Sequence, residues 1–381
     1  MTDWKSSLRA DPTGWLLETA CAAIRYRVRV ELLETAGEDP ALLQARQDAL
    51  AYAPALQLQR KQRRDGTWGG VIHAGDARKQ QTSTEHALYR LFEYGWSRDT
   101  RPVKLGAQLL RSYLTAKKDL KFHEFAKAVK ADERRERYYR WFLRVLALGM
   151  LVRAGYLDDR SRLAVLELLE YTAGFVDDPV SRAPTEEIGA SHPLIRREAW
   201  KNGYPFLPDL HLARVFAYSP WLLDGELAKM RLKKVFDYVL SPTYQQIAPG
   251  LGLVRTAKGS FPKSGGMRLH PVEYYQRHGN LDELLVYLEL FARLGLINRY
   301  PLLMSYMEWL QSLQGKDGKW NLSTKLLADN SRWTTLLRLE KDWRSPARKE
   351  ADLTFRMLLL IKYQWERQMR MLDRRDDSYP V

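Results

Sequence analysis

The sequence contains one short turn motif twice, at 62–70 and at 314–322. The first copy reads QRRDGTWGG and the second QGKDGKWNL, so Gln, an Asp-Gly pair and Trp recur at the same spacing. Asp-Gly pairs favour tight turns because glycine adopts positive φ at little steric cost. A long amphipathic helical pattern precedes each copy, and another apolar helical pattern follows each. A turn duplicated between helices predicts a chain built from helical repeats.

Apolar residues recur at intervals of three and four along most of the chain, which predicts helices, and no useful length alternates as a strand does. After a first helix at 14–35, the helices alternate in character. One set has a charged face and lies at 41–62, 103–116, 160–176, 224–240 and 301–313. The other set is apolar on most sides and lies at 84–95, 136–154, 208–219, 281–295 and 351–366.

A helix that is apolar on every side must be covered on every side. Alternating outer and inner helices therefore predict an all-α fold. We expect one α/α toroid domain over 1–381, made of about six helical hairpins. The segment 372–381 is expected to fray, as chain ends commonly do.

Long polar loops precede four of the five apolar helices, at 63–82, 177–207, 241–279 and 315–350. Loops of this length inside a compact domain are usually functional. We expect them to gather at one mouth of the ring, together with the first turns of the inner helices. Those first turns offer acids, histidines and a tyrosine as candidate catalytic groups, with helix capping as the competing role. These candidates are Glu85, His86, Tyr138, Asp209, His211 and Asp282.

Three of the loops contain side chains that we expect to bind a substrate. The first, at 184–212, is expected to form a lid or wall. The segment 255–280 is strongly basic, with Glu273 as its one acid, and would favour an anion near helix N-termini. The last loop adds a Trp beside arginines, which suits stacking on a ligand. The candidates are Arg196, Arg197 and Trp200, then Lys263, Arg268, His270, Arg277 and His278, and finally Trp333.

Composition limits the class of protein. No apolar run is long enough to span a membrane, and the N-terminus lacks the order of a signal peptide, so a cytoplasmic protein is expected. A single cysteine, Cys21, excludes a disulfide framework and a thiolate-rich metal site, and we expect neither a metal nor a cofactor. The net charge of +15 favours an anionic partner, such as a phosphorylated substrate or nucleic acid.

The two motifs, running from Gln62 to Trp68 and from Gln314 to Trp320, resemble the Gln/Trp repeats of the terpenoid-cyclase and protein-prenyltransferase toroids. The helix STEHALYRLFEYGW at 83–96 resembles the inner helix of those repeats, and VRTAKGSFP at 254–262 resembles a degenerate third copy with Phe261 in place of Trp. The resemblance implies an enzyme that processes an isoprenoid in a central aromatic-lined cavity.

Three catalytic signatures of that superfamily are missing from the sequence. These are the Asp-x-Asp-Asp acid motif, the zinc site of Asp, Cys and His, and a convincing Asp-Asp-x-x-Asp motif for magnesium and diphosphate. The pair Asp158 and Asp159 stands at the start of a predicted helix, where carboxylates cap the first turn. We therefore expect these two residues to be structural.

Three classes of function remain open. The preferred one is a terpenoid cyclase-like enzyme on an isoprenoid or isoprenyl diphosphate, with Glu85, Asp209 or Asp282 as its acid. The second is a lyase, hydrolase or binding protein for an anionic polysaccharide, with Tyr138 and His211 as acid and base. The third is a non-catalytic module that binds nucleic acid or a protein partner through its basic surface.

Overall fold

The structure is a computed structural model that describes residues 3–74, 83–115, 120–130, 132–186, 193–247, 251–256, 259–263, 265–327 and 332–376, except for the side chains of 332–334 and 370–376. The chain forms two compact units. Unit 1 comprises Met1–Lys61, Tyr89–Ser97 and His270–Val381, and unit 2 comprises Gln62–Leu88 and Arg98–Leu269. The single domain over 1–381 stays a prediction.

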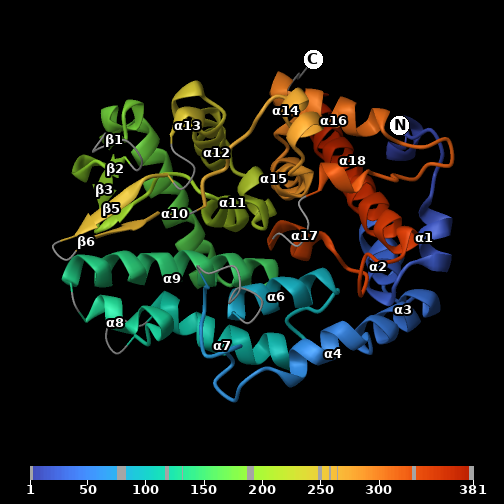
Figure 1. Cartoon of the computed structure of the whole chain (residues 1–381), viewed down its shortest axis with the longest axis horizontal. Helices are drawn as coiled ribbons and strands as arrows, with labels where there is room; N and C mark the ends of the chain where they lie inside the picture. Colours follow the sequence, from blue (N-terminus) through green and yellow to red (C-terminus); the bar gives the residue numbers. More distant parts are fainter. Residues whose placement is uncertain are drawn as a thin grey trace. The chain divides into compact units, whose positions relative to one another are not determined.

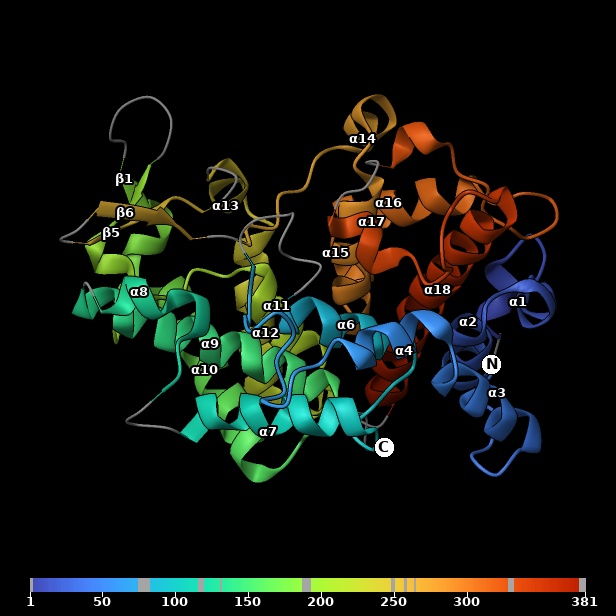
Figure 2. The ribbon, with the colours of Figure 1, turned by 60° about the horizontal axis from the view of Figure 1, so that its bottom comes forward.

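Unit 2 is built around α9 (Glu133–Arg153), the longest of its described helices. On one side α9 packs against α7 (Arg101–Thr115), as Figure 2 shows, and it also packs against α11 (Leu210–Ala217) and α10 (Asp159–Asp177). The helix α12 (Glu226–Val239) covers α10. Short helices complete the unit: α8 (Ala126–Val129), α13 (Pro242–Gln246) and the first residues of α6 (Thr84–Glu93).

Unit 2 also contains short strands that the sequence analysis did not predict (Figure 1). The strands β1 (Thr185–Glu186), β2 (Leu194–Ile195), β5 (Leu253–Thr256) and β6 (Gly259–Pro262) form one sheet in the order β1-β2-β5-β6. Its β2–β5 pair is parallel and the other pairs are antiparallel. The strands β3 (Trp200–Lys201) and β4 (Tyr204–Pro205) form a small hairpin. Strands of two to four residues are too short for an alternating pattern to stand out.

Unit 1 brings both ends of the described chain together. Its N-terminal part contains α1 (Thr13–Thr19), α2 (Ala22–Arg27) with a π-helical turn at Val28–Leu32, α3 (Pro40–Leu50) and α4 (Ala53–Arg60). Its C-terminal part contains α14 (Val272–His278), α15 (Leu281–Arg293), α16 (Pro301–Ser312), α17 (Arg332–Leu337) and α18 (Pro346–Asp376). The end of α6 completes the unit.

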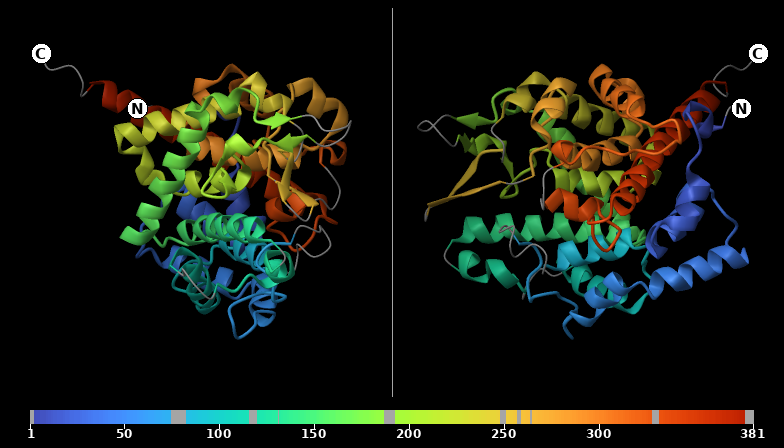
Figure 3. Two further views of the ribbon diagram at one scale, coloured as in Figure 1. Left: turned by 90° about the vertical axis from the view of Figure 1, so that its left-hand side faces the viewer. Right: turned by 45° about the vertical axis from the view of Figure 1, so that its right-hand side comes forward.

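Three predicted helix boundaries in unit 1 are wrong. The helix expected at 14–35 is divided into α1, α2 and the π-helical turn. The helix expected at 41–62 is divided into α3 and α4, because Pro54 lacks an N–H and its ring would clash with the carbonyl of Leu50 in a continuous helix; the proline instead stands in the first turn of α4. The last helix is longer than expected: α18 runs to Asp376, and its final turns extend away from the other helices of unit 1 (Figure 3). Residues 377–381 of the predicted frayed tail lie outside the described residues.

The protein is mostly helical, as predicted. As the sequence also predicts, some helices are buried on nearly all sides and others on one face only. Every residue of α11 is buried, and so is each residue of α18 from Ala351 to Lys362. In unit 1 the buried helices α15 and α18 pack against each other. By contrast, α10 and α16 each bury one face. As expected, Asp158 caps α10 by accepting the N–H of Ser161 at 3.0 Å.

The two copies of the turn motif make the same contacts. In unit 2, Gln62 Nε2 donates to the carbonyl of Gly66 at 3.2 Å, and the N–H of Trp68 donates to Thr84 Oγ1 at 3.1 Å. In unit 1, Gln314 Nε2 donates to the carbonyl of Gly318 at 2.8 Å, and the N–H of Trp320 donates to Thr354 Oγ1 at 3.0 Å. Both tryptophans are buried. Each motif thus ties a tight turn to a threonine on the helix that follows it.

The segment 254–262 does not repeat this arrangement. It forms the β5–β6 hairpin, in which Val254 pairs with Phe261. Phe261 lies between the rings of Tyr138 and Tyr139, at centroid distances of 4.8 and 5.4 Å. The interpretation of this segment as a third copy of the motif is therefore not supported by its structure.

Candidate active centre in unit 2

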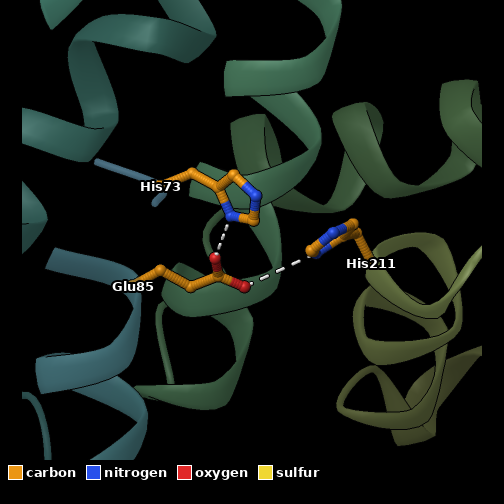
Figure 4. A group of neighbouring side chains, drawn as sticks. All are labelled: His73, Glu85 and His211. Atoms are coloured by element: carbon orange, nitrogen blue, oxygen red, sulfur yellow. Dashed lines mark hydrogen bonds and ion pairs between the residues drawn. The ribbon is translucent and has the colours of Figure 1, made fainter. Parts of the chain in front are cut away.

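Three buried polar side chains from separate segments of unit 2 meet at one point (Figure 4). His73 Nδ1 lies 2.6 Å from Glu85 Oε2, and His211 Nδ1 lies 3.5 Å from Glu85 Oε1. The three side chains are between 8% and 13% exposed. We call this group the His73–Glu85–His211 cluster. One carboxylate is thus placed between two imidazoles with little access to water.

The first turn motif places His73 and Glu85 next to each other. The chain leaves the motif through Val71 and Ile72, whose carbonyls accept the N–H groups of Thr84 and Glu85 at 3.1 and 3.0 Å. These two N–H groups belong to the first turn of α6. N–H groups in the first turn of a helix have no carbonyl of the same helix to bind. The carbonyls of the two residues before His73 therefore supply the hydrogen-bond acceptors for the first turn of α6, the helix that carries Glu85. An acid in the first turn also interacts favourably with the helix dipole.

His211 is positioned by the residues at the start of α11. Asp209 caps this helix, because its Oδ1 accepts the N–H of Leu212 at 2.9 Å. The other oxygen of Asp209 binds Lys263 Nζ at 2.5 Å, and both side chains are 1% exposed. The N–H of Leu210 donates to the carbonyl of Gly265 at 2.7 Å. The first turn of α11 is thus fixed by the Asp209–Lys263 pair and by the Leu210–Gly265 hydrogen bond. Because His211 lies in this turn, its position is fixed as well.

Glu85 is a buried anion. Burial disfavours its charged form, but the neighbouring His73 and His211 outweigh burial and hold the pKa of Glu85 well below its usual range. Arg214, one turn after His211 on α11, adds a permanent positive charge: its Nη1 lies 3.0 Å from Glu85 Oε1. Glu85 therefore acts as the counter-charge of the cluster and is not suited to donate a proton.

An aromatic ring, Phe142, lies against the cluster, and further aromatic rings pack behind it. Phe142 presents its ring at right angles to both imidazoles, at centroid distances of 5.2 Å from His73 and 5.5 Å from His211. Tyr138 stacks on Phe142 and contacts Tyr204. Burial, together with the charge of Asp209, raises the pKa of Tyr138 well above its ordinary value, so its hydroxyl stays protonated at neutral pH.

The structure brings together some of the predicted site residues. Glu85 and His211 belong to the cluster, Asp209 and Lys263 pair beside it, and Tyr138 lies behind Phe142. Lys263 is therefore already neutralised by Asp209, which argues against its predicted role as an anion-binding cation. The half-buried His86 follows Glu85, and its N–H donates to Ser83 Oγ.

Other predicted residues of unit 2 lie elsewhere. Arg196, Arg197 and Arg268 are exposed. Trp200 is partly buried under the guanidinium of Arg134, at 5.2 Å from the ring centroid. The segment 255–280, predicted as one basic loop, is divided between the β5–β6 hairpin of unit 2 and α14 of unit 1.

The remaining predicted residues belong to unit 1. Asp282 is fully buried in the first turn of α15. His270 stacks on Tyr274 at 3.8 Å, and Arg277 and His278 are exposed at the end of α14. The side chain of Trp333 lies outside the described residues.

His73 and Arg214 were missed by the sequence analysis. His73 lies in a segment that reads as polar loop, and Arg214 lies in an apolar helix pattern. One signal for each was available: His73 comes five residues after the motif Trp68, and Arg214 stands three residues after His211, on the same helix face.

Comparison of the chain with protein-family models, with curated proteins and with solved structures finds no significant match. The resemblance to the terpenoid-cyclase toroids thus rests on the turn motifs and the helix pattern of the sequence alone. Within the described ranges, no helix has both the length and the apolar character needed to cross a bilayer.

Proposed function

We propose that this chain is an enzyme whose active centre is the His73–Glu85–His211 cluster. We further propose a terpenoid cyclase-like activity on an isoprenoid or isoprenyl diphosphate, in an aromatic-lined cavity within an α/α toroid. The observation that supports a catalytic centre is the buried, ionised Glu85 between two imidazoles. Burying such a group costs stability, so perturbed groups of this kind concentrate at functional sites.

The cluster suits a reaction that needs a positive electrophile. Glu85 balances the positive charge of Arg214, and it would also balance a proton carried by His73 or His211. A histidine, in place of the acids expected from the sequence, would then deliver the proton to a substrate. Phe142, which contacts both imidazoles, and Tyr138, which stacks on Phe142, are the rings that would stabilise a carbocation formed beside the cluster. The turn motifs support the isoprenoid as the substrate class.

The polysaccharide alternative is less well supported by the geometry. It pairs Tyr138 with His211 as acid and base, but Phe142 contacts both of these residues with its ring. The raised pKa of Tyr138 also makes it a poor base at neutral pH.

Product analysis tests the proposed function. Purified protein is incubated with isoprenyl diphosphates of several chain lengths and with squalene-like hydrocarbons, and extracts are analysed by gas chromatography and mass spectrometry. We expect a cyclised or rearranged product from one of these substrates.

The variant Glu85→Gln should lower kcat by about 100-fold or more, because the counter-charge is lost. The matched variant Glu226→Gln, at an exposed residue, should leave kcat unchanged. Absence of any product from all substrates would contradict the proposed function.

A further inference from the structure

We infer that the His73–Glu85–His211 cluster is a binding site for one divalent transition metal ion, Zn²⁺, held by the two imidazoles and the Glu85 carboxylate. This inference rests on the proposed function only for the identity of the active centre. It refines that function, since the electrophile that Glu85 balances would be a metal ion in place of a proton.

The cluster supplies a suitable donor set. Its three ligand atoms, one from each side chain, all lie within 4.8 Å of one another. Two histidines and one carboxylate are a known ligand set for catalytic zinc, in which a fourth position remains open. Imidazole nitrogen also prefers Zn²⁺ to the hard ions Mg²⁺ and Ca²⁺. The small exposed fractions of the three side chains favour four-coordinate zinc over a six-coordinate ion that needs several waters.

The distances require only small movements. Tetrahedral zinc with bonds of about 2.0–2.1 Å separates neighbouring ligand atoms by about 3.3 Å. The His211 Nδ1 to Glu85 Oε1 distance of 3.5 Å is close to this value. The His73 Nδ1 to Glu85 Oε2 distance of 2.6 Å is that of a hydrogen bond and must widen. A metal would therefore take the place of the proton that His73 Nδ1 shares with Glu85 Oε2.

The surroundings orient each ligand, as metal sites require. The N–H of His73 donates to Glu124 Oε1 at 2.6 Å, which fixes the backbone that carries this imidazole. Arg214 donates to Glu85 Oε1 at 3.0 Å and holds the carboxylate plane. The ring of Phe142 packs at right angles against both imidazoles and restricts their movement.

Metal analysis of the full chain tests the inference. Protein produced with zinc and iron in the medium is dialysed against metal-free buffer, and its metals are measured by inductively coupled plasma mass spectrometry. We expect one zinc per chain in the wild type and in Glu226→Gln. We expect at least a tenfold loss of zinc in Glu85→Gln and in His211→Asn. His73→Asn, whose backbone anchors stay in place, serves as a third variant if the others fail to fold.

A second measurement does not depend on the metal acquired in cells. Apo protein is titrated with Co²⁺, and the intense visible absorption of four-coordinate cobalt should appear in the wild type and be absent in folded His73→Asn. Zinc-free wild type, zinc bound equally by all variants, or iron in place of zinc would each overturn the assignment.

The outcomes separate the metal site from the proposed function. Turnover of an isoprenoid by protein that holds no metal would support the function and overturn the metal site. Zinc bound at the cluster, with no product from any isoprenoid, would support the metal site and contradict the isoprenoid activity.

Discussion

Glu124 fixes the position of His73 without touching its imidazole. One oxygen of the Glu124 carboxylate accepts the N–H of His73 at 2.6 Å, and the other accepts the N–H of Ile72 at 2.9 Å. Glu124 lies in a 3₁₀ turn at His123–Phe125, more than fifty residues along the chain. Through hydrogen bonds to the backbone, the Glu124 side chain thus fixes the position of His73, a candidate metal ligand.

Glu124→Gln should disturb the cluster while leaving the fold intact. The amide has one accepting oxygen and places its NH₂ group against a backbone N–H, so one of the two contacts is lost. We expect about tenfold weaker zinc binding, as is typical when a residue that orients a ligand is changed. Competition with a chromophoric chelator measures the affinity. Zinc binding as tight as in the wild type would show that His73 is held by other contacts. Glu226→Gln again provides the control.

The glycines of the two turn motifs should tolerate no side chain. Gly66 and Gly318 have φ of +85° and +82°. A Cβ on Gly66 would meet the carbonyl oxygen of Leu105 at 2.6 Å, and one on Gly318 would meet the carbonyl oxygen of Ala10 even more closely. We expect Gly66→Ala and Gly318→Ala each to lower the free energy of unfolding by at least about 2 kcal/mol.

Gly174 provides a matched control for these two glycines. It lies inside α10, and a Cβ there would meet nothing within 4 Å. Gly174→Ala should raise stability by about 0.5–1 kcal/mol, because alanine loses less backbone entropy in a helix. Urea denaturation measures all three variants. Equal effects at the three positions would contradict the close packing of the turns.

Unit 1 contains a buried network of charged side chains whose disruption should be costly. Arg356 pairs with Glu93 and, at 3.0 Å, with Glu289, while Arg27 pairs with Glu93 at 2.5 Å. Arg356→Met would leave two carboxylates close together with less positive charge between them. We expect a loss of about 3–5 kcal/mol in the free energy of unfolding. Arg137→Met, which removes an exposed ion pair with Glu133, should cause no measurable change in a parallel denaturation.

Asp352 should make the stability of the protein depend on pH. Its carboxylate accepts the N–H of Leu339 at 2.7 Å and the indole N–H of Trp343 at 2.6 Å. Burial raises the pKa of Asp352 to about 7, against the hydrogen bonds that favour its charged form. In the unfolded chain an aspartate titrates near pH 3.9. Between about pH 4 and 7 the folded protein thus holds a proton that the unfolded chain has released, so stability falls as pH rises.

Comparison with Asp352→Asn isolates this contribution from other titrating groups. Relative to the variant, the wild type should lose a few kcal/mol between pH 4 and 7, with no further change at higher pH. Denaturation of both proteins at several pH values gives the difference. A difference that stays constant with pH would mean that Asp352 is charged throughout.

The sequence predicted the parts of the structure that follow from periodic patterns. Apolar spacing located most helices, and the duplicated motif identified two turns with the same contacts, from Gln62 to Thr84 and from Gln314 to Thr354. The short strands and the break at Pro54 were missed, because a few residues do not establish a period. The helix expected to start at residue 351 begins earlier, at Pro346.

The candidate site was harder to predict, because its residues meet only through the fold. Glu85 and His211 were identified as first-turn residues, yet nothing local pairs them with each other. His73 joins them because the carbonyls of Val71 and Ile72 cover the start of α6. Lys263 was expected to bind an anion, but the fold places it against Asp209. Long-range contacts of this kind leave no periodic signal in one sequence.

The contact between Gln314 and the N-terminal segment sets an order for folding during synthesis. Gln314 Oε1 accepts the N–H of Arg9 at 2.9 Å, so residues 9 and 314 must both have left the ribosome before this part of unit 1 can close. All of unit 2 lies between them in the sequence and leaves the ribosome before residue 314. The N-terminal part of unit 1 therefore cannot complete its packing until the C-terminal part, which begins at His270, has been synthesised. That interval is when a chaperone would matter most to this protein.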